Sequence, residues 1–289
     1  MAEERWGFLP VLGQQLEYRW VGPGPDQAPT VVFLHEGLGS AALWRDLPDR
    51  VAAATGCGVV QYSRHGYGGS SRKPHPWAET YLREEAKIWL PRVIDALGIN
   101  SAILVGHSDG GSIAAIAAGL HSVRQLQGVA LLAPHVMAEP ATLAGVRGAI
   151  EAFEKARLRD HLRRYHGDNT DDVFWGWALA WERLCADDWD ERPLLSNIKV
   201  PVLVVQGDDD EYGSAEQYRS IQSLVPGGAD VCVLEQCRHL LYRDRPGEVT
   251  DALCGFVGKA KGAGGGFAFT PRGGYLPLAA GPSVQNRVE

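Results

Sequence analysis

The stretch that decides the fold runs from residue 102 to residue 120 and begins Ala102-Ile103-Leu104-Val105-Gly106-His107-Ser108-Asp109-Gly110-Gly111-Ser112. Its apolar start predicts a strand buried on both faces, and the Ala-rich segment that follows predicts a helix. Between them, Gly-x-Ser-x-Gly is typical of a sharp strand-to-helix turn, whose crowded backbone requires small flanking residues. The stretch therefore predicts an α/β sheet with the Ser108 hydroxyl standing at the carboxyl edge of a strand.

Similar apolar, β-branched runs recur on both sides of this stretch, and helical patterns separate them. This alternation predicts one mostly parallel, doubly wound sheet. Strands are expected at 31–34, 59–62, 102–105, 129–132, 202–206 and 231–234, and helices at 41–54, 77–97, 112–120, 214–224 and 246–257. A short run at 16–20 is expected to add an antiparallel edge hairpin.

One connection, between residues 132 and 202, is far longer than a simple crossover requires. Its helical patterns at 140–165 and 171–184 carry a cluster of aromatic residues and predict an inserted helical cap. The aromatic side chains either form the core of the cap or line a ligand pocket. We expect Trp177, Trp181 and His135 to contact substrate. The predicted domains are a first core part at 1–134, the cap at 135–199, a second core part at 200–258 and a flexible Gly/Pro-rich tail at 259–289.

Length and composition exclude several classes of protein. With 289 residues, of which 45% are hydrophobic, the chain can bury a core without disulfides or metal. Acidic residues (35) outnumber Lys plus Arg (28), so we expect no nucleic-acid partner. The acidic start and the shortness of the longest apolar stretch, 113–120, predict a cytoplasmic protein without a membrane anchor. Five irregularly spaced cysteines indicate free thiols, and no metal site is expected.

A serine nucleophile needs a base and a carboxylate that orients the base. The predicted strand 202–206 is followed by Gly207-Asp208-Asp209-Asp210-Glu211, and the predicted strand 231–234 is followed, within a few residues, by His239. The carboxyl ends of parallel strands meet at one edge of a sheet, so the loops there converge on one crevice. We therefore expect Ser108, one aspartate of the 208–210 run and His239 to come together.

Several motifs together resemble the α/β-hydrolase superfamily, in particular its capped, esterase-like serine hydrolases. They are LHEGLGS at 34–40, SRHGYGGS at 63–70, GHSDGG at 106–111, VPVLVVQGDDDEY at 200–212 and CRHLLYRDRPGEV at 237–249. The resemblance covers about residues 15 to 258 and implies that the acid is Asp210. It also implies an oxyanion hole formed by the backbone N–H of Asp109 and that of Gly37, with Leu38 as its neighbour.

The chain departs from this superfamily at Glu36, where glycine is usual, and at Arg238, before the histidine. His35 is expected to brace the loop. We expect the Glu36 side chain to face outward, the alternative being a polar group near the substrate. Asp109 either interacts with the dipole of the helix that follows it or pairs with an α-ammonium group of a substrate.

The resemblance implies hydrolysis of a carboxylic ester or thioester of a small, largely apolar substrate through an acyl-enzyme, without a cofactor. Three alternatives stay open: hydrolysis of carbon–carbon bonds in ring-cleavage products, hydrolysis of amino-acid esters, and noncatalytic ligand binding on the same fold. The oligomeric state also stays open, with a homodimer among the alternatives.

Overall fold

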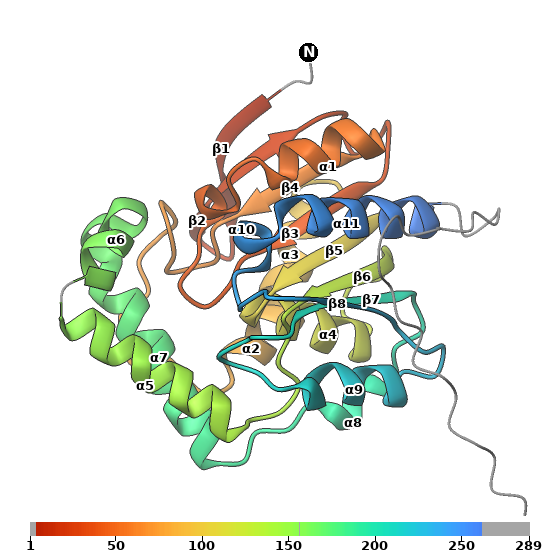
Figure 1. The fold of residues 1–289 in the computed structure, drawn as a ribbon. Coiled ribbons are helices and arrows are strands. Elements are labelled where there is room, and N and C mark those ends of the chain that lie inside the picture. Colours follow the sequence, from red (N-terminus) through yellow and green to blue (C-terminus); the bar gives the residue numbers. More distant parts are fainter. Residues whose placement is uncertain (1–3, 156, 262–289) are drawn as a thin grey trace, which may run out of the picture.

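An eight-stranded sheet forms the centre of the molecule in the computed structural model, which describes residues 4–155 and 157–261 (Figure 1). The strand order is β1-β2-β4-β3-β5-β6-β7-β8; β1–β2 and β2–β4 pair antiparallel and all other pairs are parallel. The expected fold class is thereby confirmed. The strands are β1 (Glu4–Val11), β2 (Gln14–Val21), β3 (Thr30–Leu34), β4 (Gly58–Tyr62), β5 (Ala102–His107), β6 (Leu126–Leu132), β7 (Val202–Gly207) and β8 (Asp230–Leu234).

Alternate residues of the inner strands enter two different cores. In β3, Val32 and Leu34 belong to one core and Val31 and Phe33 to the other. This explains why these strands are apolar without interruption, since both faces are covered by helices. The first core is covered by α2 (Tyr81–Glu84), α3 (Leu90–Ala96), α4 (Asp109–Gly119), α8 (Arg192–Leu195) and α9 (Ala215–Leu224), and the second by α1 (Leu47–Thr55), α10 (Leu241–Asp244) and α11 (Pro246–Lys261).

The long connection between β6 and β7 holds a helical insertion, residues 133–201. Its helices α5 (Pro140–Glu154), α6 (Arg157–His166) and α7 (Thr170–Ala186) lie to one side of the sheet, at the left of Figure 1. Helices α5 and α7 pack through the stacked rings of Phe153 and Phe174, whose centroids are 3.7 Å apart. The helical pattern expected at 140–165 corresponds to two helices, α5 and α6, rather than one.

Several boundaries differ from the sequence-based expectation. The expected antiparallel edge hairpin is present, but its first strand, β1, was not located. Trp6 and Phe8 of this edge strand are exposed, and its apolar run contains Pro10, which argues against a strand interior. The helix expected at 41–54 is divided into η1 (Ala41–Trp44) and α1, because Arg45 adopts a positive φ of 54° between them. The helix expected at 77–97 begins only at Tyr81 and changes to a π-helical turn, η2 (Glu85–Trp89), before α3.

At the other end of the chain, helix α11 continues to Lys261, so the tail boundary expected after residue 258 is wrong for residues 259–261. The remainder of the expected tail lies outside the described residues. No helix in the described ranges is long and apolar enough to cross a membrane.

Candidate active site

Ser108 lies on the turn between β5 and α4 with φ 53° and ψ −117°. A Cβ atom added to Gly106 would lie 2.0 Å from the Gly110 carbonyl oxygen, and one added to Gly110 would lie 1.9 Å from the Leu34 oxygen. Both glycines are therefore required by the close approach of backbone segments. The turn has the sharp geometry that the sequence predicts, and it presents the serine at the carboxyl end of β5.

His239 connects Ser108 to Asp210. Its Nε2 is 2.9 Å from Ser108 Oγ, and its Nδ1 is 2.9 Å from each carboxylate oxygen of Asp210. A carboxylate accepts only, so Nδ1–H donates to Asp210 and Nε2 is free to accept the serine proton. Asp208 and Asp209 are exposed, and Asp208 accepts a hydrogen bond from the Cys237 amide instead.

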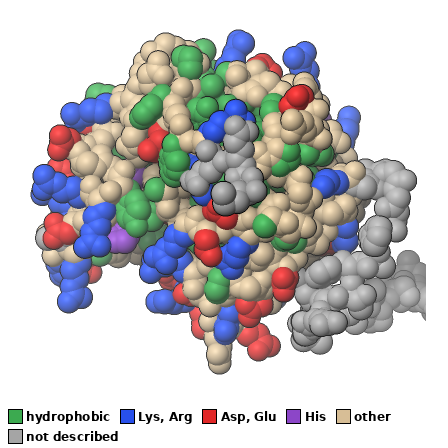
Figure 2. All heavy atoms as spheres, turned by 90° about the horizontal axis from the view of Figure 1, so that it is seen from above, with side chains coloured by type: hydrophobic (Ala, Val, Ile, Leu, Met, Phe, Trp, Pro, Cys, Tyr) green, Lys and Arg blue, Asp and Glu red, His purple; other side chains and the backbone are tan. Residues whose placement is uncertain are grey.

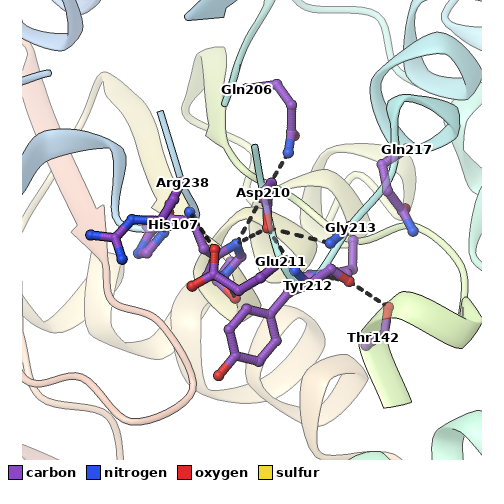
Figure 3. A network of polar contacts seen from close by, with 12 residues as sticks. His107, Thr142, Gln206, Asp210, Glu211, Tyr212, Gly213, Gln217 and Arg238 are labelled. Carbon is purple, nitrogen blue, oxygen red and sulfur yellow. Dashed lines mark hydrogen bonds and ion pairs between the residues drawn. The ribbon is translucent and has the colours of Figure 1, made fainter. Parts of the chain in front are cut away.

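The end of β7 and the loop after it hold Asp210 through several donors (Figure 3). Gln206 Nε2 donates to Oδ2 at 2.6 Å, and the backbone N–H groups of Tyr212 and Gly213 donate to Oδ1 at 2.8 and 3.3 Å. Burial alone would raise the pKa of Asp210, but the hydrogen bonds from His239 and the Tyr212 amide outweigh it and lower the pKa. Asp210 is therefore ionised at neutral pH and fixed in orientation.

The backbone of His239 is held from two sides. His107 Nε2–H donates to its carbonyl oxygen at 2.8 Å, and Glu211 accepts its N–H at 3.1 Å. Glu36 lies beside His107, with its Oε2 atom 3.7 Å from His107 Nδ1. Burial raises the pKa of Glu36, but His107, the Glu36 backbone N–H and the charge of Arg64 together outweigh burial and lower the pKa. The expectation that Glu36 faces outward is wrong, because its carboxylate turns in toward this histidine.

The loop after β3 is braced by two histidines. The Arg64 backbone N–H donates to His35 Nε2 at 3.1 Å, so His35 donates from Nδ1 to the Glu36 carbonyl at 2.7 Å. Burial, reinforced by the Arg64 charge, holds the pKa of His35 well below its usual value, and the ring is neutral. From the helical insertion, His166 Nε2–H donates to the Leu38 carbonyl at 3.0 Å. These contacts fix the loop next to the serine.

Gly37 lies directly under an indole ring of the insertion. A Cβ atom at this position would be 2.0 Å from Trp177 Nε1, so the ring could not keep its place above any larger residue. Gly37, Leu38 and Asp109 line the same cavity as Ser108. The structure thus places all the expected oxyanion-hole residues in the wall of the cavity that Ser108 lines.

The Asp109 side chain is buried and makes three contacts. Oδ2 accepts from the Tyr81 hydroxyl at 2.6 Å, Oδ1 accepts from Trp181 Nε1 at 3.0 Å, and the Arg64 guanidinium is 3.6 Å away. Tyr81, at the start of α2, and Arg64, in the loop after β4, were not predicted because both are distant from residue 109 in the sequence. The carboxylate therefore lies at the start of α4, as expected, and is paired within the protein.

A cavity of about 240 Å³ lies above these residues. The expected substrate-contacting residues Trp177, Trp181 and His135 all line it. His135 Nε2–H donates to the Tyr212 carbonyl at 3.2 Å, and burial together with the nearby His239 lowers the pKa of His135 to about 4. The remaining wall is mainly apolar and was not predicted residue by residue; it includes Leu43, Val146, Leu158, Leu162, Leu240 and Tyr242. Among the described residues no cluster of His, Cys, Asp and Glu could hold a metal ion.

A mostly parallel sheet, with a serine on a strand-to-helix turn and an aspartate and a histidine at neighbouring strand ends, defines an α/β hydrolase fold. The chain belongs to the alpha/beta hydrolase family, whose family model matches residues 31–252. The resemblance found in the sequence motifs is thereby confirmed, and the chain is a hydrolase-family protein.

The individual relatives have low sequence identity to this chain or match only part of it. Carboxylesterase YbfK of Bacillus subtilis is 25% identical over 267 residues, which cover 82% of this chain and 83% of the relative. Proline iminopeptidase of Lactobacillus delbrueckii subsp. lactis is 37% identical over 112 residues, 38% of this chain and 37% of that protein. An esterase from Exiguobacterium antarcticum has the same fold with a TM-score of 0.71 at 19% identity, covering 88% of this chain and 100% of that chain.

Proposed function

We propose that the protein is a serine hydrolase that cleaves a carboxylic ester or thioester of a small, largely apolar substrate. The observation that carries the proposal is the His239 ring, with one nitrogen 2.9 Å from Ser108 Oγ and the other 2.9 Å from Asp210. The long match to a carboxylesterase supports ester bonds as the target. A cytoplasmic location, no nucleic-acid or membrane partner and no cofactor belong to the same proposal.

In this mechanism His239 Nε2 takes the Ser108 proton while Oγ attacks the substrate carbonyl carbon. The imidazolium then gives its proton to the departing alcohol or thiol, and the acyl group stays on Ser108. Water then loses a proton to His239 and attacks the acyl carbon, and His239 returns this proton to Ser108 Oγ as the carboxylic acid leaves. Asp210 remains ionised throughout and stabilises the imidazolium, which fits the lowered pKa of its carboxyl group.

The oxyanion of each tetrahedral intermediate is assigned to the backbone N–H groups of Asp109 and Gly37, with Leu38 as neighbour. Backbone donors of this kind work because they are already oriented before charge develops. The braced loop at 36–38 and the first turn of α4 provide such rigidity. Trp177, Trp181 and His135, with the aliphatic wall of the cavity, are assigned to hold the apolar part of the substrate.

The alternatives are less well supported. Amino-acid esters would need a free carboxylate for the α-ammonium group, whereas Asp109 is already paired with Tyr81, Trp181 and Arg64. The proline iminopeptidase relatives match only 38% of the chain, so they give weak support to peptide cleavage. No feature of the cavity favours carbon–carbon bond hydrolysis. A noncatalytic binding protein would not need the aligned hydrogen bonds of Ser108.

Replacement of Ser108 with alanine tests the proposal. Hydrolysis of p-nitrophenyl esters should fall by about 10⁶-fold, because the covalent attachment point is lost. The melting temperature should stay close to that of the wild type, since only one hydroxyl group is removed. Ester hydrolysis by Ser108→Ala at a rate near that of the wild type would contradict the assignment.

A further inference from the structure

Three basic side chains line the cavity and take no part in the mechanism above. Arg45 follows η1, His161 belongs to α6 and Arg243 belongs to α10, so three separate elements direct them to one place. Both arginines are exposed to solvent. We refer to Arg45, His161 and Arg243 as the basic rim.

Within the described residues, neither Arg45 nor Arg243 forms a side-chain hydrogen bond or ion pair with any other residue. Of the carboxylates that line the cavity, Asp109 pairs with Arg64, Glu211 accepts the His239 amide, and Glu36 faces His107 at 3.7 Å, beyond hydrogen-bond distance. Arginine is a planar multiple donor that matches carboxylate and phosphate oxygens. The two arginines of the rim therefore have donors that none of these carboxylates takes up.

The charges of the rim act together. Burial lowers the pKa of His161, and the nearby cations Arg164, Arg243 and Arg45 lower it further. The chain as a whole has a net charge of −7, although α6 carries further arginines beside His161. Basic and acidic side chains are interspersed over the face drawn in Figure 2. Arg45 and Arg243 therefore lie close enough to His161 for their charges to reach the same part of the cavity.

The backbone conformation of Arg45 is unusual. This residue has φ 54° and ψ −125°, a conformation that residues other than glycine rarely adopt. Its N–H bonds to the Ala42 carbonyl and closes η1. Strained conformations of this kind persist only where the surroundings enforce them. At Arg45 the strain lies in the residue whose side chain lines the cavity.

We propose that the natural substrate carries an anionic group, a carboxylate or a phosphate, which binds to the basic rim while its ester carbonyl lies at Ser108. The inference rests on the proposed ester hydrolysis and narrows its substrate class. The apolar wall of Leu158, Leu162 and Val146 would hold the chain between the two ends of the substrate.

Matched esters test the inference. The pair is p-nitrophenyl hexanoate, which is neutral, and the mono-p-nitrophenyl ester of adipate, which has the same chain length and a terminal carboxylate. A third ester carries a terminal phosphonate in place of the carboxylate. The wild type should have a kcat/KM about 10- to 100-fold higher for one of the anionic esters, the gain expected from charge-assisted hydrogen bonds. The anionic ester with the higher kcat/KM shows whether the rim prefers a carboxylate or a phosphate-like group.

The double variant Arg45→Gln/Arg243→Gln should reduce the ratio of anionic to neutral kcat/KM to near one. Arg124→Gln is the matched control, because Arg124 is exposed and lies outside the cavity, between α4 and β6; it should keep the wild-type ratio. Increasing salt should lower the ratio in the wild type. Equal kcat/KM values for neutral and anionic esters in the wild type, or a preference that survives in the double variant, would overturn the inference.

Calorimetry separates a failure of this inference from a failure of the proposed function. If no ester is hydrolysed, the proposed function fails, but binding of the same esters to Ser108→Ala still measures the charge preference. Tighter binding of an anionic ester, lost in Arg45→Gln/Arg243→Gln on the Ser108→Ala background, supports the basic rim. Equal binding of all three esters rejects it.

Discussion

The strand-end loops and the helical insertion contribute to the same cavity in different ways. Ser108, Asp210 and His239 come from the ends of strands and are fixed by short polar contacts to backbone and side chains. The insertion contributes mainly apolar surface, and its links to the rest of the site include Trp181 to Asp109 and His166 to Leu38. Polar contacts closely fix the positions of Ser108, Asp210 and His239, whereas apolar contacts mainly determine the volume of the cavity. We therefore expect the strand-end loops to control rate and the insertion to control the ranking of substrates.

Of the variants proposed here, Asp210→Asn should show the largest difference between an effect on kcat and an effect on the ranking of substrates. An amide cannot stabilise the imidazolium and can hold the wrong tautomer of His239, so kcat should fall by about 10⁴-fold. The substrate ranking should stay the same, because the cavity wall is unchanged. Steady-state kinetics over an ester series measures both quantities.

Asp209→Asn is the matched control for this variant, because Asp209 precedes Asp210 in the same loop but is exposed. It should retain nearly all of the activity. If Asp209→Asn were as damaging as Asp210→Asn, the assignment of the acid would be wrong.

His135 lies where the strand-end region passes into the insertion, and its burial should be visible in the pH dependence of stability. The pKa of His135 is about 4 in the folded protein, against 6.5 for an unperturbed histidine. Between these two values the unfolded chain binds a proton that the folded chain does not, so the free energy of unfolding decreases as the pH falls from 6.5 to 4. The shift corresponds to at most about 3.5 kcal/mol.

Urea denaturation of the wild type and of His135→Gln at pH 7 and pH 4.5 measures this effect. The variant should lose less stability on acidification, because it cannot bind the extra proton when unfolded. Equal losses for the two proteins would show that His135 is not buried in its neutral form.

Trp177→Phe and Trp181→Phe should change the ranking of substrates rather than the chemistry. Each removes part of the cavity wall, and kcat/KM should change unequally across esters of different bulk, by about 10-fold or more for the most affected ester. Trp181→Phe should also be the less stable variant, because it leaves Asp109 Oδ1 without its indole donor. An unchanged ranking in both variants would show that these rings only hold the insertion together.

The same two regions differ in how far the sequence predicts them. Ser108, Asp210 and His239 could be located because each follows a recognisable buried strand or matches a family motif, and parallel strands place such positions at one edge. The acid position needed the family resemblance, since Asp208 and Asp209 satisfy the same pattern. The expected contact of Trp177 with the cavity also agrees with its position over Gly37.

Other features depend on contacts between segments that are distant in the sequence, so no local sequence pattern predicts them. The inward turn of Glu36 follows from His107, which lies on a neighbouring strand. The pairing of Asp109 with Tyr81 and Arg64 needs three segments to be placed in space. Arg45 and Arg243 lie in loops and short helices, where periodicity says nothing about direction. Side-chain orientation in such places is decided by tertiary packing.

Covalent labelling tests the central claim most directly. A fluorophosphonate reacts with a serine only when a neighbouring base has activated its hydroxyl. The account predicts a single adduct by intact mass, located on Ser108 by peptide mapping, absent from Ser108→Ala and formed much more slowly in Asp210→Asn. An adduct on another residue, or ester hydrolysis by a protein whose Ser108 is never labelled, would contradict it.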